Sequence, residues 1–141
     1  MQNILFLGGA GFIGSNLVRY FLNDNDYKVF VFEPTFAHLD RLSDLRDKIT
    51  IIRGSIADFD LVKCVIEDHR IDIIVHLVST LIPGSTYEDF KREFENVVFP
   101  TVRIMDLCAD NGVKFIYFSS GGTVYGNSAK GEQFHETDLL S

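Results

Sequence analysis

Three glycines at regular spacing, Gly8, Gly11 and Gly14, lie between an apolar run at 4–7 and a segment at 16–23 with helical periodicity. This order predicts a buried strand, a turn and a helix, which together can bind a phosphate. Gly8 lets the chain leave the strand through a tight turn, and Gly11 leaves room for a pyrophosphate beside the backbone. Gly14 allows the helix to pack closely on the strand.

The start of this predicted helix supplies the binding chemistry. Its first N–H groups, around Phe12 and Ile13, have no partner within a helix, and the helix dipole places a partial positive charge there. A diphosphate can therefore bind without a basic side chain. The glycine segment predicts a dinucleotide site, and the alternative is a glycine-rich turn without a ligand.

An acidic residue, Glu33, ends the second apolar run at 29–33. A carboxylate at the end of the second strand accepts hydrogen bonds from an adenosine ribose and repels a 2′-phosphate. No Arg or Lys occupies the next four positions, so the sequence favours NAD over NADP. The alternative is an ordinary solvated acid at a strand end.

The elements that must position these residues are predicted from apolar runs that alternate with helical segments. The predicted strands include 4–7, 29–34, 49–52, 73–78 and 115–118. Segments with helix-like spacing occur at 16–23, 36–45, 61–66 and 87–111, and Asp58 can cap the third of these. Continuous apolar runs indicate strands that are covered on both faces. The pattern predicts an α/β fold with a doubly wound parallel sheet, strand order 3-2-1-4-5, and ligands at the carboxyl ends of strands one and four.

The segment 87–111 carries two apolar stripes and a proline. The first stripe comprises Phe90, Phe94, Val97, Thr101, Ile104 and Cys108, and the second comprises Val98, Val102, Met105 and Ala109. One stripe can face the sheet, and the other then requires a second partner. Pro100 is expected to kink or divide the helix.

Composition excludes several classes of partner and site. The length of 141 residues predicts a single domain. The formal net charge of −7 argues against nucleic acid or an anionic membrane as the main binding partner. No apolar run is long enough to span a bilayer. Cys64 and Cys108 lack a C-x-x-C pattern and are expected to be buried, reduced thiols in a cytoplasmic protein. No metal site is apparent, and His76 is expected to be a hydrogen-bonded core residue.

The ordered motifs resemble those of the extended short-chain dehydrogenase/reductase superfamily, in its NAD-dependent epimerase/dehydratase family. They are G-x-x-G-x-x-G at 8–14, G-S-I-A-D at 54–58, H-L-V-S at 76–79, N-V-V-F-P-T at 96–101 and S-S-G-G-T-V-Y-G at 119–126. The resemblance implies a Rossmann-like fold and a set of cofactor contacts beyond Gly8, Gly11, Phe12, Ile13, Gly14 and Glu33. Ser55 and Ile56 would lie at the adenine, and Asn96 and Ser119 would lie toward the nicotinamide end. The backbone of Leu77, Val78 and Ser79 would follow the ribose and pyrophosphate.

The serine- and glycine-rich segment at 119–126 would carry the catalytic loop. The family places a serine or threonine at the position that Gly121 occupies, so Ser120 or Thr123 would replace it as the catalytic hydroxyl, and Tyr125 would contact substrate. The family's Tyr-x-x-x-Lys acid–base pair does not follow this loop within the chain. Tyr87 and Lys91 have the Tyr-x-x-x-Lys spacing, but they precede the loop, and we attribute this match to chance.

The resemblance implies that residues 1–141 are the NAD-binding part of a nucleotide-sugar epimerase or dehydratase, without its substrate domain and inactive alone. The implied type is a UDP-hexose 4-epimerase, which acts through a 4-keto sugar and pairs as a homodimer through the 87–111 helix. A non-catalytic NAD-binding regulatory module or pseudoenzyme is the alternative, and epimerase, dehydratase and reductase are not distinguished. An S-adenosylmethionine methyltransferase would not explain the serine- and glycine-rich loop.

Overall fold

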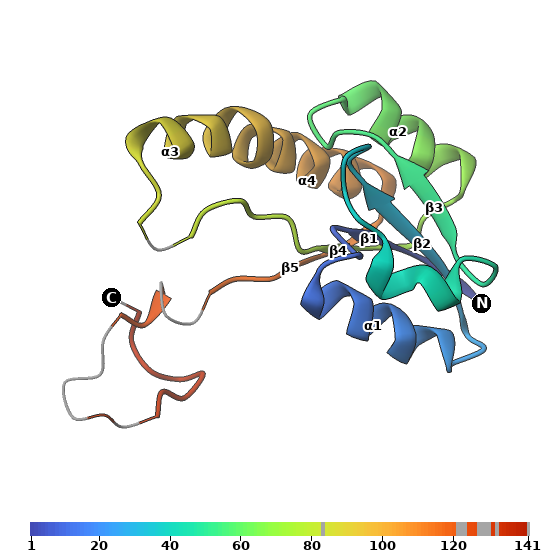
Figure 1. Cartoon of the computed structure of the whole chain (residues 1–141), viewed down its shortest axis with the longest axis horizontal. Coiled ribbons are helices and arrows are strands. Elements are labelled where there is room, and N and C mark those ends of the chain that lie inside the picture. The colour runs from blue at the N-terminus through green and yellow to red at the C-terminus, as the bar shows by residue number, and fades with distance from the viewer. Residues whose placement is uncertain (83, 121–123, 127–130, 132, 141) are drawn as a thin grey trace.

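The computed structural model describes residues 1–82, 84–120, 124–126, 131 and 133–140. Five strands form one sheet in the order β3-β2-β1-β4-β5, and every neighbouring pair is parallel (Figure 1). The strands are β1 (Gln2–Leu7), β2 (Tyr27–Glu33), β3 (Thr50–Arg53), β4 (Ile73–His76) and β5 (Lys114–Tyr117). The predicted strand order is therefore confirmed.

Helices cover both faces of the sheet, as a doubly wound fold requires. They are α1 (Phe12–Leu22), the 3₁₀ helix η1 (Asp40–Leu45), α2 (Phe59–Asp68), α3 (Tyr87–Glu93), the π-helical turn η2 (Phe94–Val98) and α4 (Phe99–Asn111). In Figure 1, α1 lies on one face, and α2 and the α3–α4 rod lie on the other. None of the described helices is long and apolar enough to cross a membrane.

Two apolar clusters form the core, one on each face of the sheet. Successive side chains of β1 alternate between them, with Leu5 and Leu7 in the cluster beneath α2 and α4, and Ile4 and Phe6 in the cluster beneath α1. All four side chains are fully buried. This two-sided burial explains why the inner strands are continuous apolar runs rather than alternating ones.

Strand β5 departs from the expectation that both faces of every strand are covered. Ile116 and Tyr117 are exposed, although the strand pairs with β4 along its length. Among the described residues, β5 has a strand neighbour on one side only. The apolar composition of β5 therefore indicates a surface that the described part of the chain does not cover.

The helix predicted at 36–45 is shorter than its apolar spacing suggested. Only Asp40–Leu45 is helical, as a 3₁₀ segment in which Leu42 and Leu45 are buried. Pro34 and a turn at 35–36 precede it, and Arg53 binds this connection from β3. Leu42 and Leu45 do pack into the core, although the segment that carries them is a short 3₁₀ helix and not an α-helix.

The cysteines were both expected to be buried, and the structure corrects one of them. Cys108 is buried in α4, and burial raises the pKa of its thiol to about 11. Cys64 is exposed, because it lies on the outer side of α2 while Val62, Val65 and Ile66 face the sheet. Neither cysteine is in a disulfide.

Pro100 divides the long helix as expected, but through a π-helical turn that changes which residues face inward. Val97, Thr101, Ile104 and Cys108 of the first stripe are buried. Phe94 is 40% exposed, and Glu93 is buried in its place with 5% exposure. A π turn inserts one residue into the helix and rotates the preceding face, so the stripe continues through Glu93.

The close approach of α1 to the glycine turn generates a test of the fold. A Cβ on Gly14 would lie 2.6–2.7 Å from the backbone of Gly8 and Gly9, whereas a Cβ on Gly11 would meet only the Gly8 carbonyl at 3.4 Å. We expect Gly14→Ala to lower the free energy of unfolding by at least about 2 kcal/mol, despite the better helix propensity of alanine.

Gly11→Ala is the matched control, with an expected loss of less than about 1 kcal/mol. Urea unfolding followed by circular dichroism compares the two variants. Equal stability of Gly14→Ala and the unsubstituted chain would contradict the packing role of Gly14.

Candidate functional site at the carboxyl edge of the sheet

The glycine turn packs directly on the end of β4. Gly8 has a φ of +84°, and its N–H donates to the Phe32 carbonyl at 3.1 Å. A Cβ on Gly8 would lie 3.2 Å from Val78 Cγ2 and 3.4 Å from the Leu77 carbonyl carbon. The left-handed backbone and this close approach both require glycine. The structure therefore brings Gly8, Leu77 and Val78 together at the point where the strand order reverses.

The N-terminus of α1 is open above this turn. Gly11 is the N-cap residue, no side chain caps the helix, and the first turn contains no acid. The side chains of Phe12 and Ile13 are 74% and 53% exposed. The first N–H groups of α1 thus keep their capacity to bind an anion, and the dipole favours one there. These features fit the diphosphate of a dinucleotide.

Glu33 lies beside the turn and is tied to it. Its Oε1 accepts a hydrogen bond from the Ala10 N–H at 2.5 Å, and the side chain is only 5% exposed. Burial raises the pKa of this carboxyl, while the Ala10 hydrogen bond and the charge of Arg53 act against the rise. Glu33 therefore fixes the glycine turn to β2, a role that the sequence did not reveal. Its predicted contact with a ribose stays a prediction.

The segment after β3 continues the same edge. Ser55 is exposed, and its Oγ accepts a hydrogen bond from the Ala57 N–H at 3.2 Å. Ile56 is buried in the core cluster under α2, and Asp58 caps α2 by accepting from the Leu61 N–H at 3.1 Å. The capping prediction is confirmed, and the adenine contacts of Ser55 and Ile56 stay predictions.

A cation that sequence reasoning missed, Arg53, also lies at this end of the edge. Its Nη1 donates to the carbonyls of Pro34 at 2.7 Å and Ala37 at 3.1 Å, and so holds the connection that follows β2. Parallel register places Arg53 directly beside Glu33. The sequence showed no basic residue in the four positions after Glu33, but the sheet supplies one from the next strand.

His76 is the core residue that the sequence predicted. It is fully buried at the end of β4, and its Nε2 lies 2.8 Å from Thr101 Oγ1. The Thr101 hydroxyl donates to the Val97 carbonyl at 2.6 Å, so Nε2 must carry the proton. Burial lowers the pKa of His76 to about 4, which keeps the ring neutral at pH 7.

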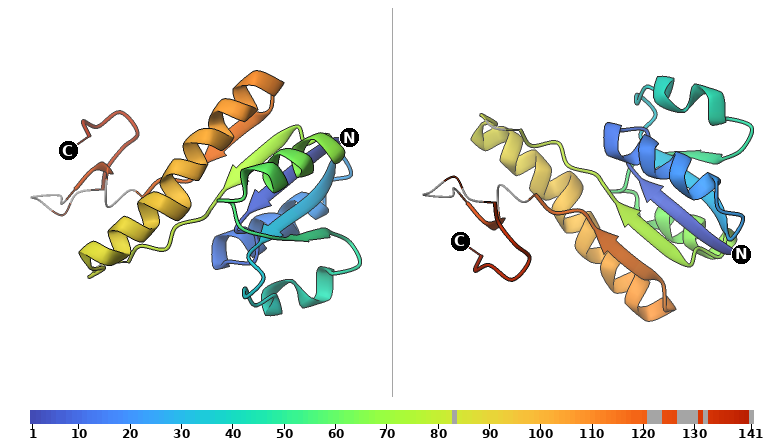
Figure 2. Two further views of the ribbon diagram at one scale, coloured as in Figure 1. Left: turned by 90° about the horizontal axis from the view of Figure 1, so that it is seen from above. Right: turned by 90° about the horizontal axis from the view of Figure 1, so that it is seen from below.

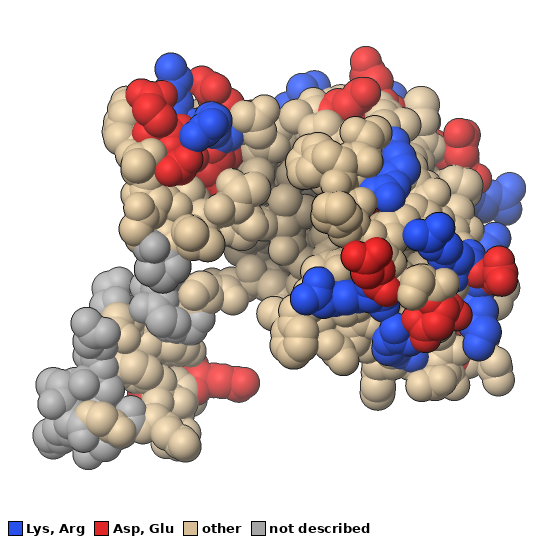
Figure 3. All heavy atoms as spheres, viewed as in Figure 1, with Lys and Arg blue, Asp and Glu red and all other residues tan. Residues whose placement is uncertain are grey.

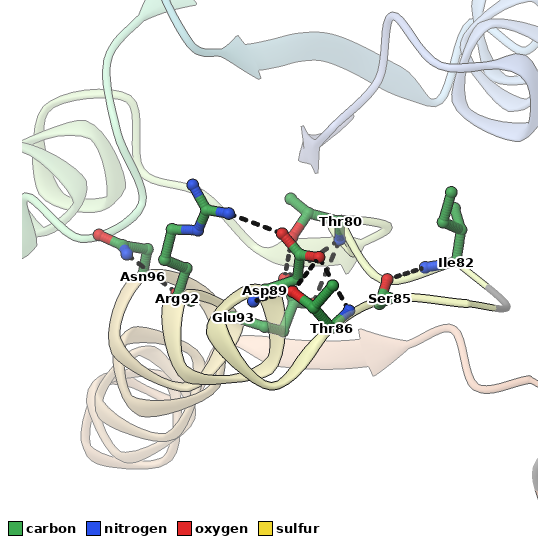
Figure 4. A network of polar contacts seen from close by, with 8 residues as sticks. All are labelled: Thr80, Ile82, Ser85, Thr86, Asp89, Arg92, Glu93 and Asn96. Carbon is green, nitrogen blue, oxygen red and sulfur yellow. Dashed lines mark hydrogen bonds and ion pairs between the residues drawn. The ribbon is translucent and has the colours of Figure 1, made fainter.

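Asn96 lies in the π-helical turn, beside the connection between β4 and α3 (Figure 4). Its Nδ2 donates to the Arg92 carbonyl at 2.9 Å. A cavity of about 400 Å³ is lined by Thr80, Asp89, Arg92, Asn96 and Val97. Asn96 therefore lies beside the connection that follows β4. The resemblance implied that Asn96 projects toward the fifth strand near a nicotinamide ribose, and this stays a prediction.

The serine-rich segment follows β5 at the same edge of the sheet. The Phe118 N–H donates to the His76 carbonyl at 3.2 Å, which extends the pairing of β5 with β4. Ser119 and Ser120 are exposed beyond this bond, and the Ser120 carbonyl accepts from the Val124 N–H at 3.1 Å. Thr123, the second candidate hydroxyl, lies outside the described residues.

Tyr125, the predicted substrate contact, is half-buried against the tail of the chain. Its ring stacks on that of Phe134 with centroids 5.2 Å apart and planes 15° apart. The phenol is therefore held by an aromatic neighbour that the sequence pattern did not indicate. Its role toward a substrate stays a prediction.

Apart from Asn96, which lies within the long helix, the described candidate residues lie at or after the carboxyl ends of strands or begin the adjoining helices. An order-reversing parallel sheet, a glycine turn and an open helix N-terminus at the reversal point define a Rossmann-like nucleotide-binding domain. Among the described residues, no group of His, Cys, Asp and Glu is placed to hold a metal ion.

The chain belongs to the NAD dependent epimerase/dehydratase family, whose model matches residues 4–140. It is similar to the UDP-glucose 4-epimerase of Halalkalibacterium halodurans, with 30% identity over 87% of this chain and 36% of that protein. The UDP-glucose 4-epimerase of Neisseria meningitidis serogroup A is 29% identical over 92% of this chain and 40% of its own. The chain thus spans about two fifths of the length of these relatives.

Solved structures show the same arrangement. The dTDP-glucose 4,6-dehydratase from Bacillus anthracis in complex with NAD superposes with a TM-score of 0.83 and 27% identity, over 100% of this chain and 44% of that one. The Thermus thermophilus UDP-glucose 4-epimerase complex with NAD gives a TM-score of 0.84 and 25% identity, over 99% and 44% of the two chains.

The buried neutral His76 generates a pH prediction. Because its folded-state pKa is about 4 and an exposed histidine titrates near 6.5, the unfolded chain binds a proton that the folded chain excludes. Stability should therefore fall by about 2–3 kcal/mol as the pH falls from 6.5 to 4. His76→Gln should flatten this part of the profile.

Urea unfolding at pH 4.5, 5.5 and 7.0 measures both profiles. Glu33, whose pKa is raised, acts with the opposite sign, because its contribution is lost as the pH rises. Glu33 is present in both proteins, so the difference between the two profiles isolates His76. Parallel profiles would contradict a neutral His76.

Proposed function

We propose that this chain binds NAD at the carboxyl edge of its sheet, as the N-terminal part of a nucleotide-sugar epimerase. The observation that carries the proposal is the open N-terminus of α1, placed over a glycine turn that contacts the end of β4. A diphosphate bound there would extend the adenosine toward Glu33 and Ser55, and the nicotinamide toward β4 and β5. Family membership supports NAD as the dinucleotide.

The substrate type that we propose is a UDP-hexose, with epimerisation at C4. Two UDP-glucose 4-epimerases are similar over most of this chain, at about 30% identity. NAD⁺ held at this edge would supply a hydride acceptor for oxidation of the sugar carbon to a ketone, and as NADH it would supply the hydride for return to the other face. Ser120 or Thr123 would hold the reacting hydroxyl, and Tyr125 would contact the sugar. Residues 1–141 carry no Tyr-x-x-x-Lys pair after this loop, so we expect them to bind cofactor without turnover.

Isothermal titration with NAD⁺ and NADP⁺ tests the cofactor. We expect NAD⁺ to bind at least about tenfold more tightly, because the buried Glu33 carboxylate can accept from a ribose hydroxyl and repels a 2′-phosphate. A preference for NADP⁺ would contradict this role and would point to Arg53 as the phosphate-binding cation.

Gly11→Ala is the paired variant, because its stability is expected to be nearly unchanged. Its methyl group would stand where the diphosphate approaches, so we expect NAD⁺ to bind about tenfold more weakly or worse. Unchanged NAD⁺ affinity in this variant would place the diphosphate elsewhere.

We also propose that the chain pairs with a second copy through α3–α4. Val102 and Met105 of α4 are exposed, and with Tyr117 of β5 they line an apolar cavity of about 270 Å³. In the view of Figure 3, charged side chains gather over α3 at the upper left and over the right-hand part of the domain, and a largely uncharged surface lies between them. Such a surface is suited to a protein contact.

Sedimentation velocity tests this pairing. Met105→Glu should convert a dimer to a monomer, because a charge would be buried at the contact. Phe36→Glu, an exposed apolar residue in the connection between β2 and η1, is the control and should leave the dimer intact. A chain that sediments as a monomer at high concentration would contradict the proposal.

A further inference from the structure

Glu93 is a buried carboxylate in α3 whose role the sequence motifs do not explain. It is 5% exposed, and both of its oxygens accept from the Thr80 N–H at 3.2 Å. One oxygen also accepts from the Thr80 hydroxyl. The adjacent Arg92 forms its ion pair with Asp89 at 2.6 Å instead.

A buried carboxylate without a cation is costly unless hydrogen bonds replace its hydration. None of the lysines and arginines in the described part of the chain forms an ion pair with Glu93. Among the described residues, Thr80 supplies the hydrogen bonds that Glu93 accepts. Figure 4 shows the two side chains facing one another between α3 and the connection that leaves β4. This contact therefore fixes Thr80 against the helix.

Thr80 lies at a sensitive place in the chain. It follows Val78 and Ser79, and Val78 contacts the glycine turn at Gly8. The connection from β4 then runs alongside the α3–α4 rod, as both views in Figure 2 show. Holding Thr80 therefore holds the backbone of Val78 and Ser79 at the β4 side of the sheet's carboxyl edge. Glu33 and Ser55 lie on the β2 and β3 side of the same edge.

We infer that Glu93 is a positioning residue for the nicotinamide half of the cofactor, acting through Thr80. The inference rests on the proposed function. In a fold of this class a dinucleotide lies across the carboxyl edge of the sheet, with its adenosine on the side of β2 and β3 and its nicotinamide riboside on the side of β4 and β5. The Glu93–Thr80 contact should therefore affect ligands that reach the β4 side and leave ADP, which ends at the diphosphate, unaffected.

Isothermal titration of the whole chain with NAD⁺ and with ADP tests the inference. Thr80→Val removes the hydroxyl that donates to Glu93. Glu93→Gln removes the negative charge of the carboxylate that accepts this hydrogen bond. We expect each variant to bind NAD⁺ about tenfold more weakly and to bind ADP within about twofold of the unsubstituted chain. Thr80→Ser keeps the hydroxyl and should retain NAD⁺ affinity. Glu95→Gln, an exposed acid in the adjoining turn η2, is the charge control.

The outcomes separate this inference from the proposed function. If the unsubstituted chain binds neither NAD⁺ nor ADP, the proposed function fails. If it binds both and Thr80→Val and Glu93→Gln bind NAD⁺ normally, only the positioning role fails. An equal loss of NAD⁺ and ADP would show that the contact merely supports the fold. If Glu93→Gln is unfolded by circular dichroism, Thr80→Val and Thr80→Ser alone decide the question.

Discussion

The distance between α1 and the glycine turn is the constraint on which the site depends. At Gly14 the helix lies so close to the backbone of Gly8 and Gly9 that no Cβ fits between them. Because of this contact, α1 begins directly over the carboxyl end of β1, and its free N–H groups point toward the crevice. A helix displaced by the width of one methyl group would move the N–H groups that we propose as partners of a diphosphate. The anion-binding capacity of the site is thus a consequence of packing.

Two buried acids hold loops at the carboxyl edge of the sheet. Glu33 extends from β2 to the Ala10 N–H, and Glu93 extends from α3 to the Thr80 N–H. In each case the carboxylate accepts a hydrogen bond from a main-chain N–H in a loop, rather than from a basic side chain. A charged acceptor makes a stronger hydrogen bond than a neutral one, especially where water is excluded. Loops that must be both irregular and fixed in place can be held in this way.

The sequence predicted the sheet well, because strands buried on both faces are continuous apolar runs and glycine spacing marks the first turn. The strand order, the capping by Asp58 and the core position of His76 all followed from local patterns. The π-helical turn did not, because a helical wheel assumes constant periodicity, and one inserted residue moved Glu93 inward and Phe94 outward. The exposure of Cys64 and of the side chains of Ile116 and Tyr117 depends on which neighbours are present, which no local pattern encodes.

Sequence reasoning also missed the contacts of Glu33 and Arg53, because these contacts join different elements of the fold. A strand-end acid and a strand-end cation in different strands become neighbours only through parallel register, which pairs Glu33 with Arg53. Sequence reasoning placed Glu33 at the end of its strand but could not show that it is also bound to Ala10. Contacts within one element could be predicted here, and contacts across elements required the fold.

The net charge of −7 raises the question of how such a chain would attract an anionic dinucleotide, as we propose. The repulsion would come from exposed side chains spread over the surface, and at physiological ionic strength it is screened beyond about 8 Å. The attraction would come from the unpaired N–H groups at the start of α1, which would contact the diphosphate directly. The first turn of α1 contains no acid that would oppose this attraction. The local backbone field would therefore decide binding at this edge, and the overall charge would limit mainly which large polyanions can approach.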